Sequence, residues 1–204
     1  MSGIAQPVLL DVPAVFTGER VILRGWQDAD AEPFYAAIRE SAERISVWLP
    51  WPKEHQSVED TRAYVRRSQA RFALREFLDM GIFTRTDGDI LGAISLIPHQ
   101  WAVPSFEIGY WLRSSAEGQG YMSEAVRLLI TYCFATLDAA RLLIRCDPRN
   151  ARSRAIPARL GFTLEGTLRN DHRGTDGTLR DMQYWTMIPE EYARAAWATR
   201  TGDR

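Results

Sequence analysis

The sequence predicts an α/β (α+β) fold with one main domain, in which helices flank a mixed sheet. The chain has 204 residues, of which 46% are hydrophobic, and a chain of this size buries enough surface to hold a core unaided. Apolar residues alternate in some segments, as in strands, and recur every three or four positions in others, as in helices. The resulting order is strand, two helices, three strands, helix, strand, helix and two strands, which favours mixed strand direction.

The first half of the chain is predicted to hold one strand followed by two helices. Residues 20–24 (RVILR) alternate apolar and polar side chains, as a strand does. Asp28 or Asp30 can cap a helix that runs to about Arg44, and the two prolines of WLPWP (residues 48–52) follow it. Residues 57–60 (SVED) resemble a capping box and predict a second helix to about Leu78 with three buried side chains, Tyr64, Phe72 and Leu74.

The second half is predicted to alternate strands and helices. An Asp-Gly pair at residues 87–88 stands between two apolar runs, which is a strong signal for a hairpin. A glycine loop precedes a helix with apolar residues at three- and four-residue spacing, and another helix begins at Asn150 and ends at Gly161. A last helix follows Pro189. The remaining strands are expected at residues 105–113, 141–146, 162–169 and 178–187.

The charge and cysteine content argue against several classes of protein. A formal net charge of -1 lacks the basic excess of a nucleic-acid-binding protein. Cys133 and Cys146 are too few for a disulfide framework, and the three histidines show no ligand spacing, so we expect no metal. No apolar run reaches the roughly 20 residues of a membrane span, and no signal peptide is visible, which favours a cytoplasmic protein. We expect a tail at residues 1–15, the domain at 16–188 and a C-terminal helix and tail at 189–204.

The most informative segment is residues 110–125, YWLRSSAEGQGYMSEA, where a strand leads through a glycine loop into a helix. Helix starts carry free backbone N–H groups and partial positive charge, and glycines let a phosphate come close. A simple turn is the alternative. No Lys-Ser or Lys-Thr follows the glycines, and no third glycine completes a dinucleotide fingerprint. The groups expected to cradle a pyrophosphate belong to Gly118, Gln119, Gly120, Tyr121, Met122 and Ser123.

This loop resembles motif A of the Gcn5-related N-acetyltransferases, Gln/Arg-x-x-Gly-x-Gly/Ala. Gly120 takes the central glycine position and Met122 the small-residue position, whereas Glu117 replaces Gln or Arg and is expected to weaken pyrophosphate binding. Residues 150–153 (NARS) followed by 160–162 (LGF) are similar to the family's Asn-x-x-Ser…Gly-Phe segment. WLPWP, EIGYWL, GQGYMSEA and LEGTLR resemble the RimJ/RimL-like branch, which acetylates N-termini of ribosomal proteins; the resemblance covers about residues 16–188.

The resemblance implies a mixed, mostly antiparallel seven-stranded sheet that splays between its fourth and fifth strands. It also implies an acetyl-CoA-dependent N-acetyltransferase, in which a primary amine such as a protein N-terminus attacks directly through a tetrahedral intermediate. A small-molecule amine, such as a polyamine or an antibiotic, is an alternative acceptor, and a coenzyme A-binding module without turnover is a third reading. The chain is expected to act as a monomer or homodimer, without nucleic acid or membrane partners.

The resemblance also implies roles for individual residues. The pantetheine arm should pair with the backbone of three residues on the fourth strand, Trp111, Leu112 and Arg113. Asn150 should bond this arm, although a helix N-cap explains it equally well. Ser153 should protonate the leaving thiolate, because Pro157 stands where many relatives have a tyrosine.

Three residues are candidates for the base that takes the amine proton: Glu107, Glu165 and His172. Glu107 is favoured because it lies in an otherwise apolar strand, and burying a charge without purpose is costly. His172 titrates in the right range but also fits a solvated loop. Trp48 and Trp51 are expected to shape the acceptor pocket, or simply to pack beneath their loop.

Overall fold

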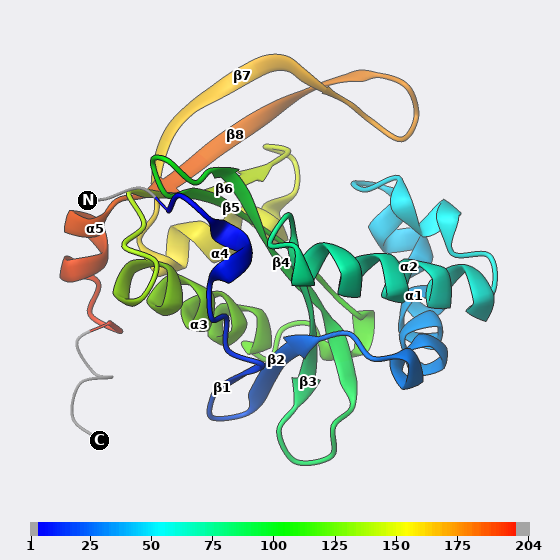
Figure 1. Ribbon diagram of the computed structural model, residues 1–204. Coiled ribbons are helices and arrows are strands. Elements are labelled where there is room, and N and C mark those ends of the chain that lie inside the picture. Colours follow the sequence, from blue (N-terminus) through cyan, green and yellow to red (C-terminus); the bar gives the residue numbers. More distant parts are fainter. Residues whose placement is uncertain (1–3, 199–204) are drawn as a thin grey trace.

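A computed structural model describes residues 4–198 and shows a single twisted sheet with helices on both faces (Figure 1). The eight strands lie in the order β1-β2-β3-β4-β5-β6-β8-β7, and every neighbouring pair is antiparallel except β5 and β6. Their bounds are β1 Val15–Thr17, β2 Val21–Gly25, β3 Leu78–Thr84, β4 Ile90–Gln100, β5 Ser105–Leu112, β6 Arg141–Cys146, β7 Thr163–Arg173 and β8 Leu179–Met187.

Helices from the two halves of the chain cover opposite faces of this sheet. The α3 and α4 helices contribute to one hydrophobic core, whereas α1 and α2 contribute to another. The helices are α1 Ala31–Ser46, α2 Val58–Ala73, α3 Tyr121–Ala135, α4 Ala151–Leu160 and α5 Pro189–Arg194. None of the helices in residues 4–198 is both long and apolar enough to cross a membrane.

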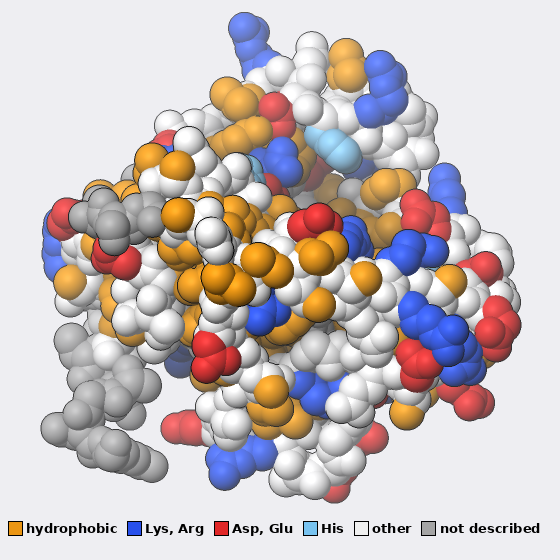
Figure 2. All heavy atoms as spheres, viewed as in Figure 1, with side chains coloured by type: hydrophobic (Ala, Val, Ile, Leu, Met, Phe, Trp, Pro, Cys, Tyr) orange, Lys and Arg blue, Asp and Glu red, His pale blue; other side chains and the backbone are white. Residues whose placement is uncertain are grey.

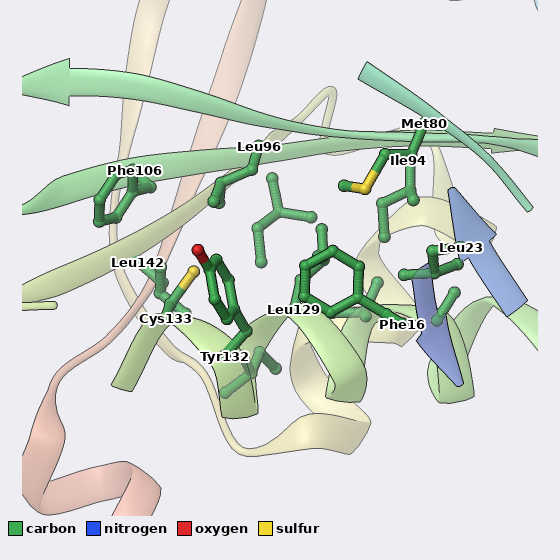
Figure 3. Close-up of a cluster of buried hydrophobic side chains, with 14 of the residues drawn as sticks. Phe16, Leu23, Met80, Ile94, Leu96, Phe106, Leu129, Tyr132, Cys133 and Leu142 are labelled. Atoms are coloured by element: carbon green, nitrogen blue, oxygen red, sulfur yellow. The ribbon is translucent and has the colours of Figure 1, made fainter. Parts of the chain in front are cut away.

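The larger core lies between the sheet and α3 (Figure 3). Leu129 and Cys133 of α3 are fully buried there and face inward-pointing strand residues such as Leu96 and Phe106. Burial raises the pKa of the Cys133 thiol well above its usual value, so this cysteine is an inert apolar side chain.

The smaller core lies on the opposite face, where Trp26 stacks on Phe34 of α1. Beside it, the fully buried carboxylate of Asp79 accepts hydrogen bonds from four side chains, which belong to Trp26, Tyr64, Ser68 and Ser95. These donors offset the cost of burying the carboxylate and tie α2 to β3 and β4.

The sheet opens between its two parallel strands. Only three residue pairs join β5 to β6, from Ser105–Arg141 to Glu107–Leu143. Beyond Glu107 the strands separate, while β5 stays paired with β4 as far as Leu112. The predicted splay between the fourth and fifth strands is therefore present, between β5 and β6.

The β7 and β8 strands form a long hairpin that arches away from the body of the sheet (Figure 1). Arg180 of β8 connects it to two other segments. Its guanidinium donates to the carbonyl of Val47, just after α1, and lies 3.9 Å from Asp147, just after β6. The hairpin is thereby attached beside the open end of β6.

The structure differs from the sequence predictions at two elements. A short additional strand, β1, pairs with β2 and gives eight strands instead of the expected seven. The α2 helix ends at Ala73 instead of near Leu78, because Arg75 adopts a left-handed conformation with φ of 60° and β3 begins at Leu78. Leu74 consequently lies at the surface, so its predicted burial is wrong. The predicted C-terminal helix corresponds to α5, and the last part of the expected tail, residues 199–204, lies outside the described residues.

Candidate active site

The open edge of β5 offers unpaired backbone groups at the splay. The Arg113 N–H donates to the Leu91 carbonyl of β4, and backbone groups alternate in direction along an antiparallel strand. The groups of Trp111 and Arg113 therefore point toward β4, whereas those of Tyr110 and Leu112 point toward the opening. The backbone groups of Tyr110 and Leu112 are thus open to a ligand, whereas those of Trp111 and Arg113, which were also expected to bind the pantetheine arm, face β4.

The glycine loop that follows β5 forms a cradle at the start of α3. Gly118 and Gly120 have φ angles of 76° and 84°, a conformation that favours glycine. Within residues 4–198, no acceptor bonds to the backbone N–H groups of residues 118–123. Free N–H groups at a helix start form an anion site, so the cradle fits a pyrophosphate.

Side chains hold this cradle in place from two sides. Arg20 donates to the Gln119 carbonyl and pairs with Glu124 in the first turn of α3. On the α1 side, Glu40 accepts hydrogen bonds from the Arg113 guanidinium and from the Ser115 N–H. The Arg113 guanidinium holds the pKa of Glu40 down at about 2. The loop is thus fixed before any ligand arrives.

Glu117, which departs from the motif, is flanked by two arginines. Its carboxylate lies 2.6 Å from Nη2 of Arg44 and 3.2 Å from Nη1 of Arg152. The three charges sum to one positive charge beside the cradle. The unfavourable effect expected of a carboxylate at this position is therefore offset by its two partners.

The first turn of α4 lies beside Tyr110. The Asn150 side chain caps the helix by accepting from the Ser153 N–H at 3.1 Å, which leaves its amide NH₂ available to a ligand. The Tyr110 hydroxyl donates to the Ser153 carbonyl at 3.1 Å. The Ser153 side chain is within bonding reach of the Cys146 thiol, and burial raises the pKa of Cys146 to about 11. Cys146 is consequently a poor nucleophile.

On the opposite sheet face, Glu107 forms a cluster with residues of the two neighbouring strands. The residue is 9% exposed, and its carboxylate accepts from Nε of Arg145 on β6 at 3.1 Å. Nε2 of His99 on β4 lies 3.0 Å from the same carboxylate. Glu107 therefore has the two partners that justify burying its charge.

Free space lies beside this cluster, over Gly109. A Cβ added at Gly109 would meet only Ile97, at 3.9 Å, so the sheet face is open there. Alternation along β5 puts Glu107, Gly109 and Trp111 on the same face. Trp111 packs against Trp51 with ring centroids 5.3 Å apart. The space is thus bounded by aromatic rings on one side and by charged groups on the other.

The other predicted site residues lie apart from this space. Trp48 is half-buried and lies next to Val47, where the hairpin is attached. His172 is exposed on β7, opposite Arg180, and no contact joins it to Glu107 within the described part of the chain. Glu165 pairs with Arg141 at the start of β6, which is the closed end of the splay. The hairpin also carries a shallow depression, lined by Thr167, Leu168, Arg169, Asn170, Asp171 and Asp181.

Sequence reasoning missed four residues of this region: Gly109, Tyr110, His99 and Arg145. One signal was available for Arg145, which is a charged residue within the apolar strand RLLIRC, as Glu107 is within its own strand. His99 gave no such signal, because a β-bulge between Pro98 and Gln100 sets its position. Residues 4–198 contain no group of three or more His, Cys, Asp or Glu side chains that could hold a metal ion.

Comparison with known proteins connects this geometry with an activity. A family model described as an acetyltransferase (GNAT) domain matches residues 20–163. A putative ribosomal N-acetyltransferase of Bacillus subtilis is 31% identical over 175 residues, which cover 85% of this chain and 94% of that protein. A ribosomal-protein-serine acetyltransferase of Escherichia coli is 31% identical over 151 residues, covering 74% of this chain and 83% of the relative.

Solved structures agree with this relationship. The crystal structure of the microcin C7 self-immunity acetyltransferase MccE, in complex with acetyl-CoA and AMP, superposes with a TM-score of 0.78 at 25% identity. The superposition covers 83% of this chain and 93% of that one. A protein whose structure contains acetyl-CoA thus has a similar fold. The chain belongs to the GNAT acetyltransferase family and is an N-acetyltransferase that uses acetyl-CoA as its donor.

Proposed function

We propose that the chain acetylates the N-terminal α-amine of a protein, in the manner of the ribosomal-protein acetyltransferases that it resembles. The open space over Gly109 is the observation that carries this proposal. It lies on the sheet face opposite α3, between the Trp51–Trp111 pair and the charged cluster of Glu107. In the view of Figure 2, the surface is hollowed below the β7–β8 hairpin.

The donor is expected to enter through the splay. The N–H groups at the start of α3 would hold the pyrophosphate, and the open backbone groups of Leu112 and Tyr110 would pair with the pantetheine amides. The NH₂ of Asn150 would donate to a pantetheine carbonyl. This path brings the thioester to the edge of β5 next to Gly109, where an amine approaching from the opposite face can reach it.

The reaction that this arrangement supports is direct attack. The amine nitrogen forms a bond to the thioester carbon, and the tetrahedral intermediate then breaks its C–S bond. Glu107 lies two residues before Gly109 on the same face of β5 and takes the amine proton, directly or through water. The sulfur leaves with the C–S electron pair, and the Ser153 hydroxyl would protonate it and regain a proton from water. An acyl-enzyme on Cys146 is disfavoured because that thiol is buried and protonated.

An acceptor panel tests the proposal. Purified protein and acetyl-CoA are mixed with peptides that begin with Ser, Ala or Met, and release of the coenzyme A thiol is measured. Matched peptides with a blocked N-terminus but an internal lysine serve as controls. Free N-termini should be acetylated and blocked peptides should not. Equal rates with blocked peptides would contradict N-terminal specificity.

A small-molecule amine is the second candidate acceptor. The similarity to the self-immunity acetyltransferase, whose structure contains AMP beside acetyl-CoA, favours it. The panel therefore includes polyamines, aminoglycosides and aminoacyl nucleotides. A kcat/KM for one of these that exceeds the best peptide value would favour this second function over the first.

A further inference from the structure

We infer that His99 is the terminal proton acceptor of the acetyl transfer, receiving through Glu107 the proton that the amine gives up. This inference rests on the proposed direct attack of an amine over Gly109, and it holds for any amine acceptor. It assigns a catalytic function to a pair, His99 and Glu107, that lies on two different strands.

The order of groups along the sheet face supports a relay. Glu107 lies opposite Ile97 of β4 and Leu143 of β6. Because β4 runs antiparallel to β5, His99 lies on the side of Glu107 that faces Ser105, away from Gly109. The carboxylate of Glu107 therefore separates the acceptor space from the histidine ring. A proton taken from the amine can thus reach His99 by way of this carboxylate.

Burial indicates the direction of transfer. The Glu107 side chain is 12% exposed, whereas the His99 side chain is 42% exposed. A proton on the His99 ring is therefore more exposed to bulk water than one held on the Glu107 carboxylate, and it can leave from the other ring nitrogen. Neutral imidazole accepts protons near physiological pH, which suits this terminal position.

Arg145 holds the Glu107 carboxylate in position beside His99. Its guanidinium bonds both carboxylate oxygens of Glu107, and it also lies over the ring of Tyr184 on β8. Glu107, Arg145 and Tyr184 are the titratable or charged groups that face this cluster from β5, β6 and β8. The contact of 3.0 Å between Nε2 of His99 and the Glu107 carboxylate gives the proton a path from the carboxylate to the ring.

The proton count of the reaction requires such an exit. An amine that binds as an ammonium ion loses two protons when it becomes a neutral amide. The departing thiolate takes up one proton as the C–S bond breaks. The other proton must reach solvent in each turnover, and the path from Glu107 through His99 provides the route.

The variant His99→Gln separates proton transfer from structural support. Glutamine can still donate a hydrogen bond to the Glu107 carboxylate, but it cannot accept a proton. We expect the kcat of His99→Gln at neutral pH to fall about tenfold or more, which is the lower part of the range for general-base loss. The Kd for coenzyme A should not change. The acidic limb of the pH–rate profile should change shape, and added imidazole should restore turnover to His99→Ala.

A double-variant cycle makes the test specific to the relay. Glu107→Gln breaks the path at its first member, so adding His99→Gln to it should slow turnover no further. Wild-type kcat and pH profile in His99→Gln would overturn the inference, as would equal slowing by His99→Gln in both backgrounds. A changed acidic limb in His172→Gln instead of His99→Gln would also overturn it. A wild-type protein inactive toward every amine would contradict the proposed function itself, which distinguishes the two failures.

Discussion

Replacing Gly120 by alanine tests the coenzyme cradle. Gly120 is the N-cap of α3, with φ of 84° and ψ of -2°. Its N–H group is among those without an acceptor at residues 118–123. A Cβ at this position would lie 3.3 Å from Nη2 of Arg20, the movable end of a flexible side chain. The variant should therefore still fold, but its added methyl group lies where the pyrophosphate should approach.

Two separate magnitudes follow from this geometry. Holding alanine in the left-handed region costs about 1–2 kcal/mol, which lowers Tm by roughly 2–8 °C for a chain of this length. Displacing a phosphate from one charge-assisted backbone bond costs about 1.5–3 kcal/mol, which corresponds to a roughly 10- to 100-fold increase in Kd. Stability and binding should thus both be affected, each for its own reason.

Gly88→Ala is the matched control. Gly88 has φ of 74° in the β3–β4 turn, and a Cβ there would meet nothing within 4 Å. Both variants should lose similar amounts of Tm in thermal unfolding. Isothermal titration with coenzyme A should show weakened binding for Gly120→Ala and wild-type binding for Gly88→Ala. A wild-type Kd for Gly120→Ala would refute the placement of the pyrophosphate.

Three further predictions concern other parts of the site. Gly109→Val should keep the fold and the affinity for coenzyme A, since a Cβ there meets only Ile97 at 3.9 Å. It should lower kcat/KM for the amine at least tenfold, because the added side chain fills the acceptor space. An unchanged kcat/KM would show that the acceptor does not bind over Gly109. Glu117→Gln leaves Arg44 and Arg152 unneutralised and should tighten coenzyme A binding at low salt, with weaker binding as the contrary result. The Glu40–Arg113 pair should stabilise the fold above pH 4.5 and lose this effect as the pH falls toward about 2, because Arg113 lowers the pKa of Glu40. The free energies of unfolding of wild type and Glu40→Gln, measured by denaturant titration, should therefore converge over that range. A difference that stays constant with pH would contradict this prediction.

Local signals predicted most of the secondary structure. The Ser57 cap is present, with its hydroxyl accepting from the Asp60 N–H, and Gly88 occupies the predicted turn. These features depend on neighbouring residues alone, so sequence patterns detect them. The end of α2 depends on a left-handed residue at Arg75, which is not a residue type that marks such a position. The short β1 strand forms only because β2 offers a free edge.

The candidate site also has one part that neighbouring residues determine and one part that distant segments determine. The glycine cradle is continuous in sequence, and the structure has free N–H groups where the motif placed them. The Glu107 cluster is assembled by the register of three strands, with a bulge beside His99. Strand register depends on how segments far apart in the sequence pair with one another, so the partners of Glu107 could not be predicted. The burial of Glu107 could be predicted, because it is a charged residue in an otherwise apolar strand.

The central claim is direct transfer of an acetyl group from acetyl-CoA to an amine on this protein's open sheet face. Its most direct test uses acetyl-CoA with an isotopically labelled acetyl group and a peptide substrate, with rapid quenching during the first turnover. Mass spectrometry of peptide and enzyme should find the label on the N-terminal nitrogen of the peptide and never on the enzyme. Label trapped on Cys146, or a peptide that stays unlabelled while coenzyme A is released, would contradict the account.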